Sequence, residues 1–173
     1  MWPVRIVIAE DEPGFLEQLS EQLKFALDLE IVGEARDAKE AFVTVGQLNP
    51  DILILGNDRP GIKGWEVLRV VRWCSPHTKV IILSSHAEEA TILEALELGA
   101  RGYIVKGNGT NIEKAIRAVQ RGELWARRRL LTQLLERYVG LAGSVLQATE
   151  DEPAPAPLLS KNWLFDEAKY LHF

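Results

Sequence analysis

The chain has 173 residues, of which 47% are hydrophobic and 26% are charged. This length and composition are those of one ordinary globular domain, or of a small domain with an appendage, and they exclude a fibrous or disordered chain. The net charge of −5 argues against a protein whose whole surface is built to bind nucleic-acid phosphates. The single cysteine, Cys74, excludes an intramolecular disulfide and a cysteine-based zinc site, so we expect a cytoplasmic protein.

Two hydrophobic periodicities alternate along the first two thirds of the chain, one typical of strands and one typical of helices. Strands are predicted over residues 4–9, 31–35, 51–55, 79–83 and 102–105. Helices are predicted between and after them, over residues 13–27, 38–48, 65–73, 87–98 and 110–122. The first apolar run meets the acids of 10–12 too soon for a signal peptide or a spanning helix, so we expect no membrane segment.

Several residues mark where the predicted helices begin and end. Pro13 stands at the start of the first helix, and Asp37 is predicted to cap the second. Gly99 is expected to end the helix over 87–98, and residues 110–113 have the pattern of a capping box. Five strands, each followed by a helix after a short connection, indicate an α/β fold with a parallel sheet and helices on both faces.

The C-terminal part of the chain does not continue this alternation. It divides by composition into a helical extension over 123–148, an acidic Pro-rich linker over 149–157 and an aromatic tail over 158–173. The tail contains three candidate partner-binding residues, Trp163, Phe165 and Leu171. One interpretation is a short amphipathic helix that docks on a partner, and the other is a segment that packs on its own domain and covers apolar surface.

Polar side chains follow the predicted strands, and in an open parallel sheet ligands bind beyond the carboxyl ends of the strands. Glu10 and Asp11 follow the first strand, and two adjacent carboxylates suit a hard cation such as Mg²⁺. Ser84 follows the fourth strand and Lys106 follows the fifth. A hydroxyl and an ammonium across a crevice suit a phosphoryl group, because one donates a hydrogen bond and the other neutralises charge.

Five stretches, in the right order and spacing, resemble the motifs of one protein family. They are residues 8–13 (IAEDEP), 50–55 (PDILIL), 59–64 (RPGIKG), 80–84 (VIILS) and 99–106 (GARGYIVK). Together they are similar to the receiver domain of two-component response regulators, of the kind found in NarL/LuxR-type regulators. The resemblance runs from Val4 to about Gly122, so a receiver domain is predicted over 1–122. It implies a flavodoxin-like fold, with five parallel strands in the order 2-1-3-4-5 and helices on both faces.

The resemblance also assigns roles at the matching positions. Glu10 and Asp11 match the acidic pair that holds Mg²⁺, and Asp58 falls where the family supplies a backbone carbonyl to the metal. The hydroxyl that senses the phosphoryl group, the lysine that pairs with it and the aromatic residue that swings on switching correspond to Ser84, Lys106 and Tyr103.

One position departs from the family's pattern. The phosphorylated aspartate of the family lies four residues before the Pro-Gly pair, and here that position is Gly56. Glycine offers no nucleophile, so no aspartyl phosphate forms there. Asp58 is the candidate substitute, but an extended chain rises about 3.3 Å per residue, which displaces it by roughly 6 Å unless the loop folds back. With one carboxylate missing, we expect a weakened Mg²⁺ site at Glu10, Asp11 and Asp58.

Simpler roles are expected for the remaining residues when no phosphoryl group is present. Lys106 is predicted to form a salt bridge with Glu10 or Asp11, and Ser84 to hydrogen-bond the adjacent loop. Tyr103 is expected to be a fixed aromatic residue rather than an active switch.

Two functions follow from this pattern, and neither is enzymatic, because a phosphotransfer enzyme would need the nucleophile that Gly56 lacks. The first is an atypical receiver that acts in signal transduction by protein–protein contact, independently of aspartyl phosphorylation. Its partner would be a sensor kinase, another regulator or a second copy, and we expect a homodimer through the surface over 87–122. The second is a NarL/LuxR-type DNA-binding transcription regulator whose helix-turn-helix is lost, shortened or supplied by a partner.

We interpret the basic cluster at Arg127, Arg128 and Arg129 as a solvated helix face rather than a DNA contact, because no base-reading element accompanies it.

Overall fold

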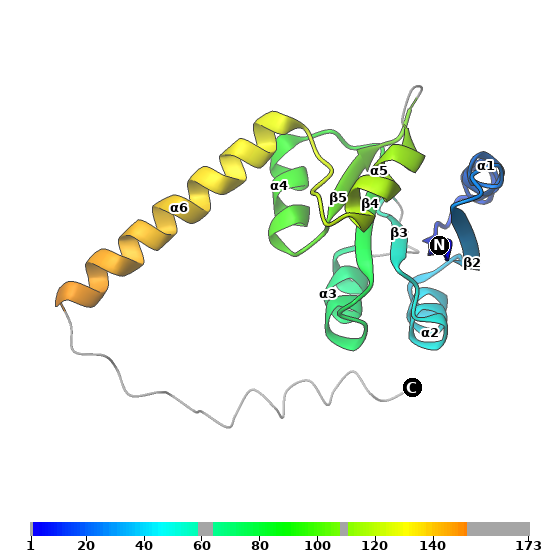
Figure 1. The fold of residues 1–173 in the computed structure, drawn as a ribbon, viewed down its shortest axis with the longest axis horizontal. Helices are drawn as coiled ribbons and strands as arrows, with labels where there is room; N and C mark the ends of the chain where they lie inside the picture. Colours follow the sequence, from blue (N-terminus) through cyan, green and yellow to red (C-terminus); the bar gives the residue numbers. More distant parts are fainter. Residues whose placement is uncertain (1, 59–63, 108–110, 152–173) are drawn as a thin grey trace. The chain divides into compact units, whose positions relative to one another are not determined.

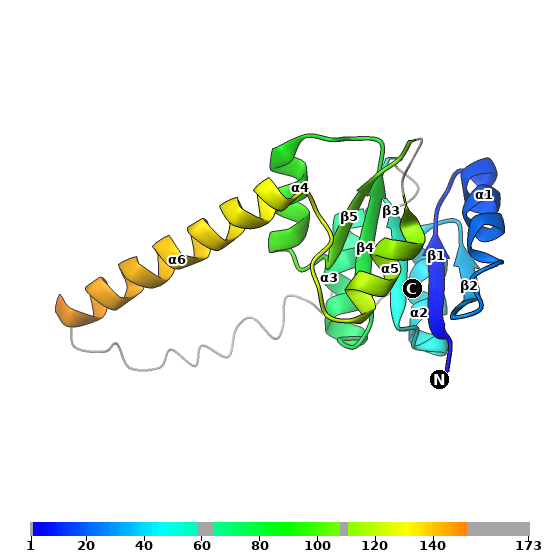
Figure 2. The same ribbon diagram turned by 45° about the horizontal axis from the view of Figure 1, so that its top comes forward.

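The computed structural model describes residues 2–58, 64–107 and 111–151, with side chains up to residue 141. Five parallel strands form one sheet in the order β2-β1-β3-β4-β5. The strands are β1 (Val4–Ala9), β2 (Leu29–Ala35), β3 (Ile52–Gly56), β4 (Lys79–Ser84) and β5 (Gly102–Val105). Figure 2 shows β2 and β5 at the two edges of the sheet. The predicted α/β fold, with its flavodoxin-like strand order, is confirmed.

Six helices accompany the strands within the described residues (Figure 1). They are α1 (Pro13–Leu23), α2 (Ala38–Leu48), α3 (Gly64–Cys74), α4 (Glu89–Glu97), α5 (Ile112–Gln120) and α6 (Arg128–Asp151). The residues that pack against one face of the sheet come from α2, α3 and α4, and those that pack against the other face come from α1 and α5. None of the helices described is long and apolar enough to cross a membrane.

The strands are covered on both faces because successive side chains point to opposite sides of the sheet. In β3, Leu53 and Leu55 contribute to the core beneath α2 and α3, whereas Ile52 and Ile54 contribute to the core beneath α1 and α5. All four side chains are fully buried. The nearly continuous apolar run of this strand therefore has the environment that its sequence predicts for a central parallel strand.

The helix ends agree with the sequence at two positions and differ at a third. Asp37 caps α2 by accepting a hydrogen bond of 2.8 Å from the backbone N–H of Glu40, as predicted. Gly99 follows α4 with a φ of 101°, a left-handed conformation that glycine adopts at little cost. The cap of α5 is Asn111, whose side chain accepts from the backbone N–H of Lys114. In place of the capping box predicted over 110–113, the structure has a single side-chain cap at Asn111, one residue later than predicted.

The predicted helical extension over 123–148 differs from the structure at both ends. Residues 123–127 are not helical, and Trp125 pairs with the edge strand β5 by donating to the carbonyl of Arg101 and accepting from the N–H of Tyr103. This pairing satisfies backbone groups that the open edge of the sheet would otherwise leave to solvent. The helix α6 starts at Arg128 and continues to Asp151, so residues 149–151, predicted as linker, are helical.

The linker was predicted to begin at residue 149, but no proline occurs in it before Pro153. Residues 149–151 therefore contain no residue that interrupts a helix, and α6 includes them. The boundary between two compact units of the chain, Met1–Leu134 and Leu135–Phe173, falls within α6. The remainder of the predicted linker and the tail with Trp163, Phe165 and Leu171 lie outside the described residues.

Candidate functional site

The polar residues that follow four of the strands come together at the carboxyl edge of the sheet. Glu10 follows β1, Asp58 follows β3 by two residues, Ser84 ends β4 and Lys106 follows β5. Parallel strands end on the same side of a sheet, and this edge is where ligands bind in open α/β folds. The structure thus gathers four of the predicted site residues into one cluster.

The centre of the cluster is the ammonium group of Lys106, which lies between two carboxylates. Its Nζ atom is 2.9 Å from Oε2 of Glu10 and 3.0 Å from Oδ2 of Asp58. The ring of Phe15 lies 4.5 Å from the same Nζ atom, in the arrangement of a cation–π contact. Burial lowers the pKa of Lys106, but its two carboxylate partners outweigh burial and raise the pKa above its usual value. The salt bridge predicted between Lys106 and Glu10 is present, and Asp58 is a second partner.

The carboxylate of Asp58 is bound by donors from two segments, residues 84–85 at the end of β4 and Lys106 after β5. Its Oδ1 atom accepts a hydrogen bond of 2.6 Å from Ser84 Oγ and one of 2.7 Å from the backbone N–H of Ser85, while Oδ2 faces Lys106. Burial raises the pKa of the Asp58 carboxyl, but these hydrogen bonds and the nearby ammonium prevail and hold the pKa at about 2. Although Asp58 lies two residues beyond the end of β3, its carboxylate therefore reaches Ser84 and Lys106.

A histidine that the sequence analysis did not select also lies at this cluster. The Nδ1 atom of His86 is 3.4 Å from Asp58 Oδ1 and 3.3 Å from Ser84 Oγ. The backbone N–H of His86 donates to Ser84 Oγ at 3.1 Å, which orients the hydroxyl towards the carboxylate. Its position two residues after Ser84 was the available signal, but the spacing of a lone histidine does not distinguish this role from a surface role.

Gly56 ends β3 and lies directly against the buried carboxylate of Glu10. A Cβ atom at this position would be 2.7 Å from Glu10 Oε2 and 3.3 Å from the backbone oxygen of Ala9. Glu10 itself is only 2% exposed. The space into which a side chain at position 56 would project is therefore occupied by Glu10, and no nucleophile stands at the end of this strand.

Two of the three carboxylates predicted to hold Mg²⁺ contact Lys106. Glu10 and Asp58 both face the ammonium, and Asp11 takes part in none of these contacts. In the part of the chain that the structure describes, no group of three or more carboxylate, histidine or cysteine side chains is arranged to hold a metal ion. The positive charge that a cation would supply to Glu10 and Asp58 is here supplied by Lys106, and the Mg²⁺ site stays a prediction.

Tyr103 of β5 is buried and connects the site to the surrounding core. Its side chain is 5% exposed, and its hydroxyl donates a hydrogen bond of 3.0 Å to the backbone carbonyl of His86. Burial raises the pKa of this phenol above its ordinary value. The ring belongs to the same buried cluster as Leu130 and Leu134 of α6. Tyr103 therefore binds the segment after β4 and is part of the core to which the first turns of α6 also contribute.

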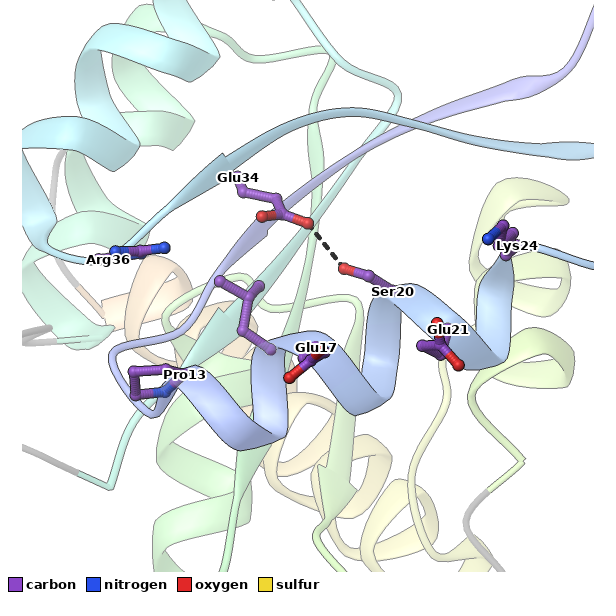
Figure 3. Close-up of a pocket in the computed structure, with 8 residues that line it drawn as sticks. Pro13, Glu17, Ser20, Glu21, Lys24, Glu34 and Arg36 are labelled. Atoms are coloured by element: carbon purple, nitrogen blue, oxygen red, sulfur yellow. Dashed lines mark hydrogen bonds between the residues drawn. The ribbon is translucent and has the colours of Figure 1, made fainter.

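Two other features lie outside this cluster. Arg127, Arg128 and Arg129 are exposed, as expected for a solvated face, and Arg129 pairs with Glu89 of α4 at 3.3 Å. A surface pocket of about 430 Å³ runs along α1 beside the end of β2 (Figure 3). In this pocket the hydroxyl of Ser20 donates to Glu34 at 2.7 Å. The pocket is lined by carboxylates, basic side chains and Pro13, and it contains none of the site residues selected from the sequence.

Comparison with known proteins identifies what this arrangement is similar to. The family model of the response regulator receiver domain matches residues 6–117. The oxygen regulatory protein NreC of Staphylococcus carnosus is 32% identical over 163 residues, which cover 93% of this chain and 74% of that protein. The probable transcriptional regulatory protein NarL of Mycobacterium tuberculosis is 33% identical over 159 residues, covering 91% of this chain and 68% of that protein.

Solved structures agree with the sequence relatives. A LuxR-family two-component response regulator from Aurantimonas sp. SI85-9A1 superposes with a TM-score of 0.70 at 28% identity, covering 79% of this chain and 99% of that one. The signal receiver domain of NarL from Mycobacterium tuberculosis superposes with a TM-score of 0.66 at 32% identity, covering 71% and 100%. The fold, the motifs at the strand ends and these similarities lead to one conclusion: the chain belongs to the response regulator receiver family and is a two-component signal-transduction protein of the NarL/LuxR type.

Proposed function

We propose that this protein is a receiver that acts by protein–protein contact, without phosphorylation of an aspartate and without catalysing a reaction of its own. The observation that carries this proposal is the position of the Asp58 carboxylate, which takes the hydrogen bonds of Ser84 Oγ and the Ser85 N–H and the charge of Lys106. These are the groups that would otherwise bind an incoming phosphoryl group. The protein's own carboxylate serves as their anion.

Two features support the absence of phosphorylation. Gly56 stands at the end of β3, where the family's phosphorylated aspartate would be, and it offers no nucleophile. Asp58 is a poor substitute, because both of its oxygen atoms are engaged and a pKa of about 2 marks a weakly basic carboxylate. Ser84, the N–H of Ser85 and Lys106 are also the groups that would have to stabilise a transferred phosphoryl group. While they bind the Asp58 carboxylate they are not available for that role.

The same carboxylate provides a reason for the fixed position of the neighbouring segments. Asp58 holds the Ser84 hydroxyl and the N–H of Ser85, and Tyr103 holds the carbonyl of His86. The residues between β4 and α4 are therefore bound at both the acidic cluster and β5. We propose that the surface formed by α4 and β5 is presented in one state and is read by a partner such as a sensor kinase, another regulator or a second copy.

For Mg²⁺ we propose weak binding at most. Glu10, Asp11 and Asp58 are the residues that would hold the ion, and it would supply positive charge to this carboxylate cluster. Lys106 already supplies a positive charge to Glu10 and Asp58, so a cation would have to compete with an ammonium group at about 3 Å from each.

The decisive experiment is incubation of the full chain with Mg²⁺ and a small phosphodonor such as acetyl phosphate, followed by intact-mass measurement. We expect no phosphoryl adduct, while a phosphorylatable receiver treated in parallel becomes modified. The matched variant carries Gly56→Asp and Asp58→Asn, which returns a nucleophile to the end of β3 and removes the competing charge. We expect this variant to acquire the adduct. An adduct on unaltered protein that peptide mapping places on Asp58 would overturn the proposal.

A second candidate function is DNA-binding transcription regulation, in which the helix-turn-helix is lost, shortened or supplied by a partner and this chain contacts DNA through its exposed arginines. It is favoured by the similarity to the probable transcriptional regulatory protein NarL, which extends over 91% of this chain and thus beyond the receiver, and by the exposed Arg127 and Arg128. Retention of the protein on duplex DNA, decreasing steeply with salt and weakened by Arg127→Gln with Arg128→Gln, would support it. Absence of retention at low salt would reject a direct DNA role.

A further inference from the structure

The helix α6 changes character along its length. Its first turns belong to the receiver, since Leu130 and Leu134 are buried in the core that contains Tyr103. From the next residue onward the large apolar side chains are exposed, by 66% at Leu135, 53% at Tyr138, 70% at Val139 and 60% at Leu141. Isolated exposed apolar residues are common, but four within seven residues of one helix form an apolar surface.

The sequence of α6 continues this apolar surface along one side of the helix. At 3.6 residues per turn, one half of the helix circumference carries the positions of Leu135, Tyr138, Val139, Leu141, Ala142, Val145 and Leu146. The other half carries Glu136, Gly140, Gly143, Ser144 and Gln147. Within the apolar half, positions 135, 139, 142 and 146 are spaced by four, three and four residues. This is the spacing of a coiled-coil seam, and its natural occupant is a helix with the same spacing.

The charges of α6 indicate both the occupant and its direction. Arg127, Arg128 and Arg129 stand at the start of the helix, and Glu150 and Asp151 stand at its end. This distribution is the reverse of the one that the helix dipole favours, because cations lie near the positive N-terminus and anions near the negative C-terminus. A second copy running antiparallel would bring the acids of one helix alongside the arginines of the other, whereas a parallel copy would bring like charges together.

The hydrophobic and charge patterns select the same alignment. When Val139 of one copy is placed opposite Ala142 of the other, Leu135 falls opposite Leu146. In that alignment the acidic end of each helix lies beside the basic start of its neighbour, with Arg129 close to Glu150 of the second copy. We infer that α6 pairs antiparallel with α6 of a second copy of this chain, through the face that contains Leu135 and Val139.

The size of this face sets the expected strength of pairing. From Leu135 to Asp151 the helix is about 25 Å long, at about 1.5 Å per residue. Two helices of this length form an interface at the small end of the range for specific complexes, which is typical of a weak, concentration-dependent dimer. This inference is independent of the proposed function, because it requires neither Asp58 nor the absence of phosphorylation.

The first test is sedimentation equilibrium of the full chain over a range of concentrations. We expect a reversible monomer–dimer equilibrium that weakens at high salt, and we expect Leu135→Glu with Val139→Glu to shift the dissociation constant at least tenfold towards monomer. The matched control, Gln133→Glu with Gln147→Glu, adds the same charge to the opposite face and should leave the equilibrium within about threefold. A monomer at every concentration, or a dimer unaffected by the first variant, would overturn the inference. The thermal unfolding midpoint of each variant shows whether the receiver remains folded.

The direction of pairing is tested by disulfide cross-linking in a Cys74→Ser background. In an antiparallel pair, Leu135→Cys in one copy lies near Leu146→Cys in another, so a mixture of the two variants should form a cross-linked dimer on mild oxidation. Leu135→Cys alone should remain uncross-linked, because its counterpart lies at the far end of the pair. Efficient cross-linking of Leu135→Cys to itself would establish a parallel pair and contradict the alignment.

Discussion

Replacement of Asp58 by asparagine keeps the size of the side chain and removes its charge. The amide oxygen of asparagine still accepts from Ser84 Oγ and from the N–H of Ser85, where Asp58 accepts at 2.6 and 2.7 Å. The second carboxylate oxygen, 3.0 Å from Lys106 Nζ, is replaced by an amide nitrogen that cannot accept a hydrogen bond. The variant Asp58→Asn therefore isolates the charged interaction with Lys106, which retains Glu10 as its remaining partner.

The magnitude follows from the pKa of Asp58, which the folded protein lowers from 3.8 to about 2. At about 1.4 kcal/mol per pKa unit the shift corresponds to about 2 kcal/mol, and partial access of water reduces this to about 1–2 kcal/mol. Because the folded-state pKa is depressed, the stabilisation is fully present above the unfolded-state value near 3.8. It is lost as the pH falls through about 2.

The assay is urea unfolding of the wild type and of Asp58→Asn at neutral pH and at successively lower pH. We expect the variant to be less stable by about 1–2 kcal/mol at neutral pH, with a difference that shrinks towards about pH 2. The control is Asp37→Asn, since Asp37 caps α2 and asparagine caps equally well. Equal stability of wild type and Asp58→Asn at neutral pH would refute the role assigned to the charge. A difference that does not change with pH would show that another property of the side chain is responsible.

Three further outcomes are expected. Gly56→Asp should lower the unfolding midpoint, because its Cβ would lie 2.7 Å from Glu10 Oε2 and its carboxylate would be the third around the Lys106 ammonium. Mg²⁺ should restore much of the lost stability, and an unfolding midpoint insensitive to Mg²⁺ would contradict this. Tyr103→Phe removes the hydrogen bond to the carbonyl of His86, so the free energy of unfolding should fall by about 1 kcal/mol. Amide hydrogen exchange in residues 85–88 should also accelerate, and unchanged exchange would show that the hydroxyl does not hold this segment. Leu130→Ala should lower the free energy of unfolding by about 2–4 kcal/mol, because Leu130 is fully buried. Leu27→Ala, at a position 98% exposed, should change it little. A loss for Leu130→Ala as small as that for Leu27→Ala would show that the start of α6 lies outside the core.

The sequence alone predicts the fold of the receiver because each of its elements repeats one unambiguous pattern. The apolar run of β3 and the cap at Asp37 are local signals, and each lies where the sequence places it. The pairing of Trp125 with β5 was not predictable in this way, because it depends on an open sheet edge formed by residues more than 20 positions earlier in the chain. A helical reading of 123–127 was the natural local interpretation.

The site was predictable as a set of residue types and not as a set of contacts. The positions of Glu10, Ser84 and Lys106 follow from the parallel strands, since each residue ends a strand or comes directly after one. The position of the Asp58 carboxylate depends on contacts with donors from β4 and from the residue after β5, which are distant in the sequence. Contacts between a carboxylate and donors far away in the sequence leave no periodic pattern by which they could be predicted. The same is true of the contact between His86 and Asp58.

The most direct test of the account is an NMR titration of the Asp58 carboxyl carbon in the full chain. The account predicts that this carboxyl titrates near pH 2, because Ser84, the N–H of Ser85 and Lys106 all stabilise its charged form. It also predicts that Lys106→Met returns the midpoint towards the ordinary value of 3.8. A carboxyl that titrates near 3.8 in the unaltered protein would contradict the account, because Asp58 would then not be the anion that these donors bind.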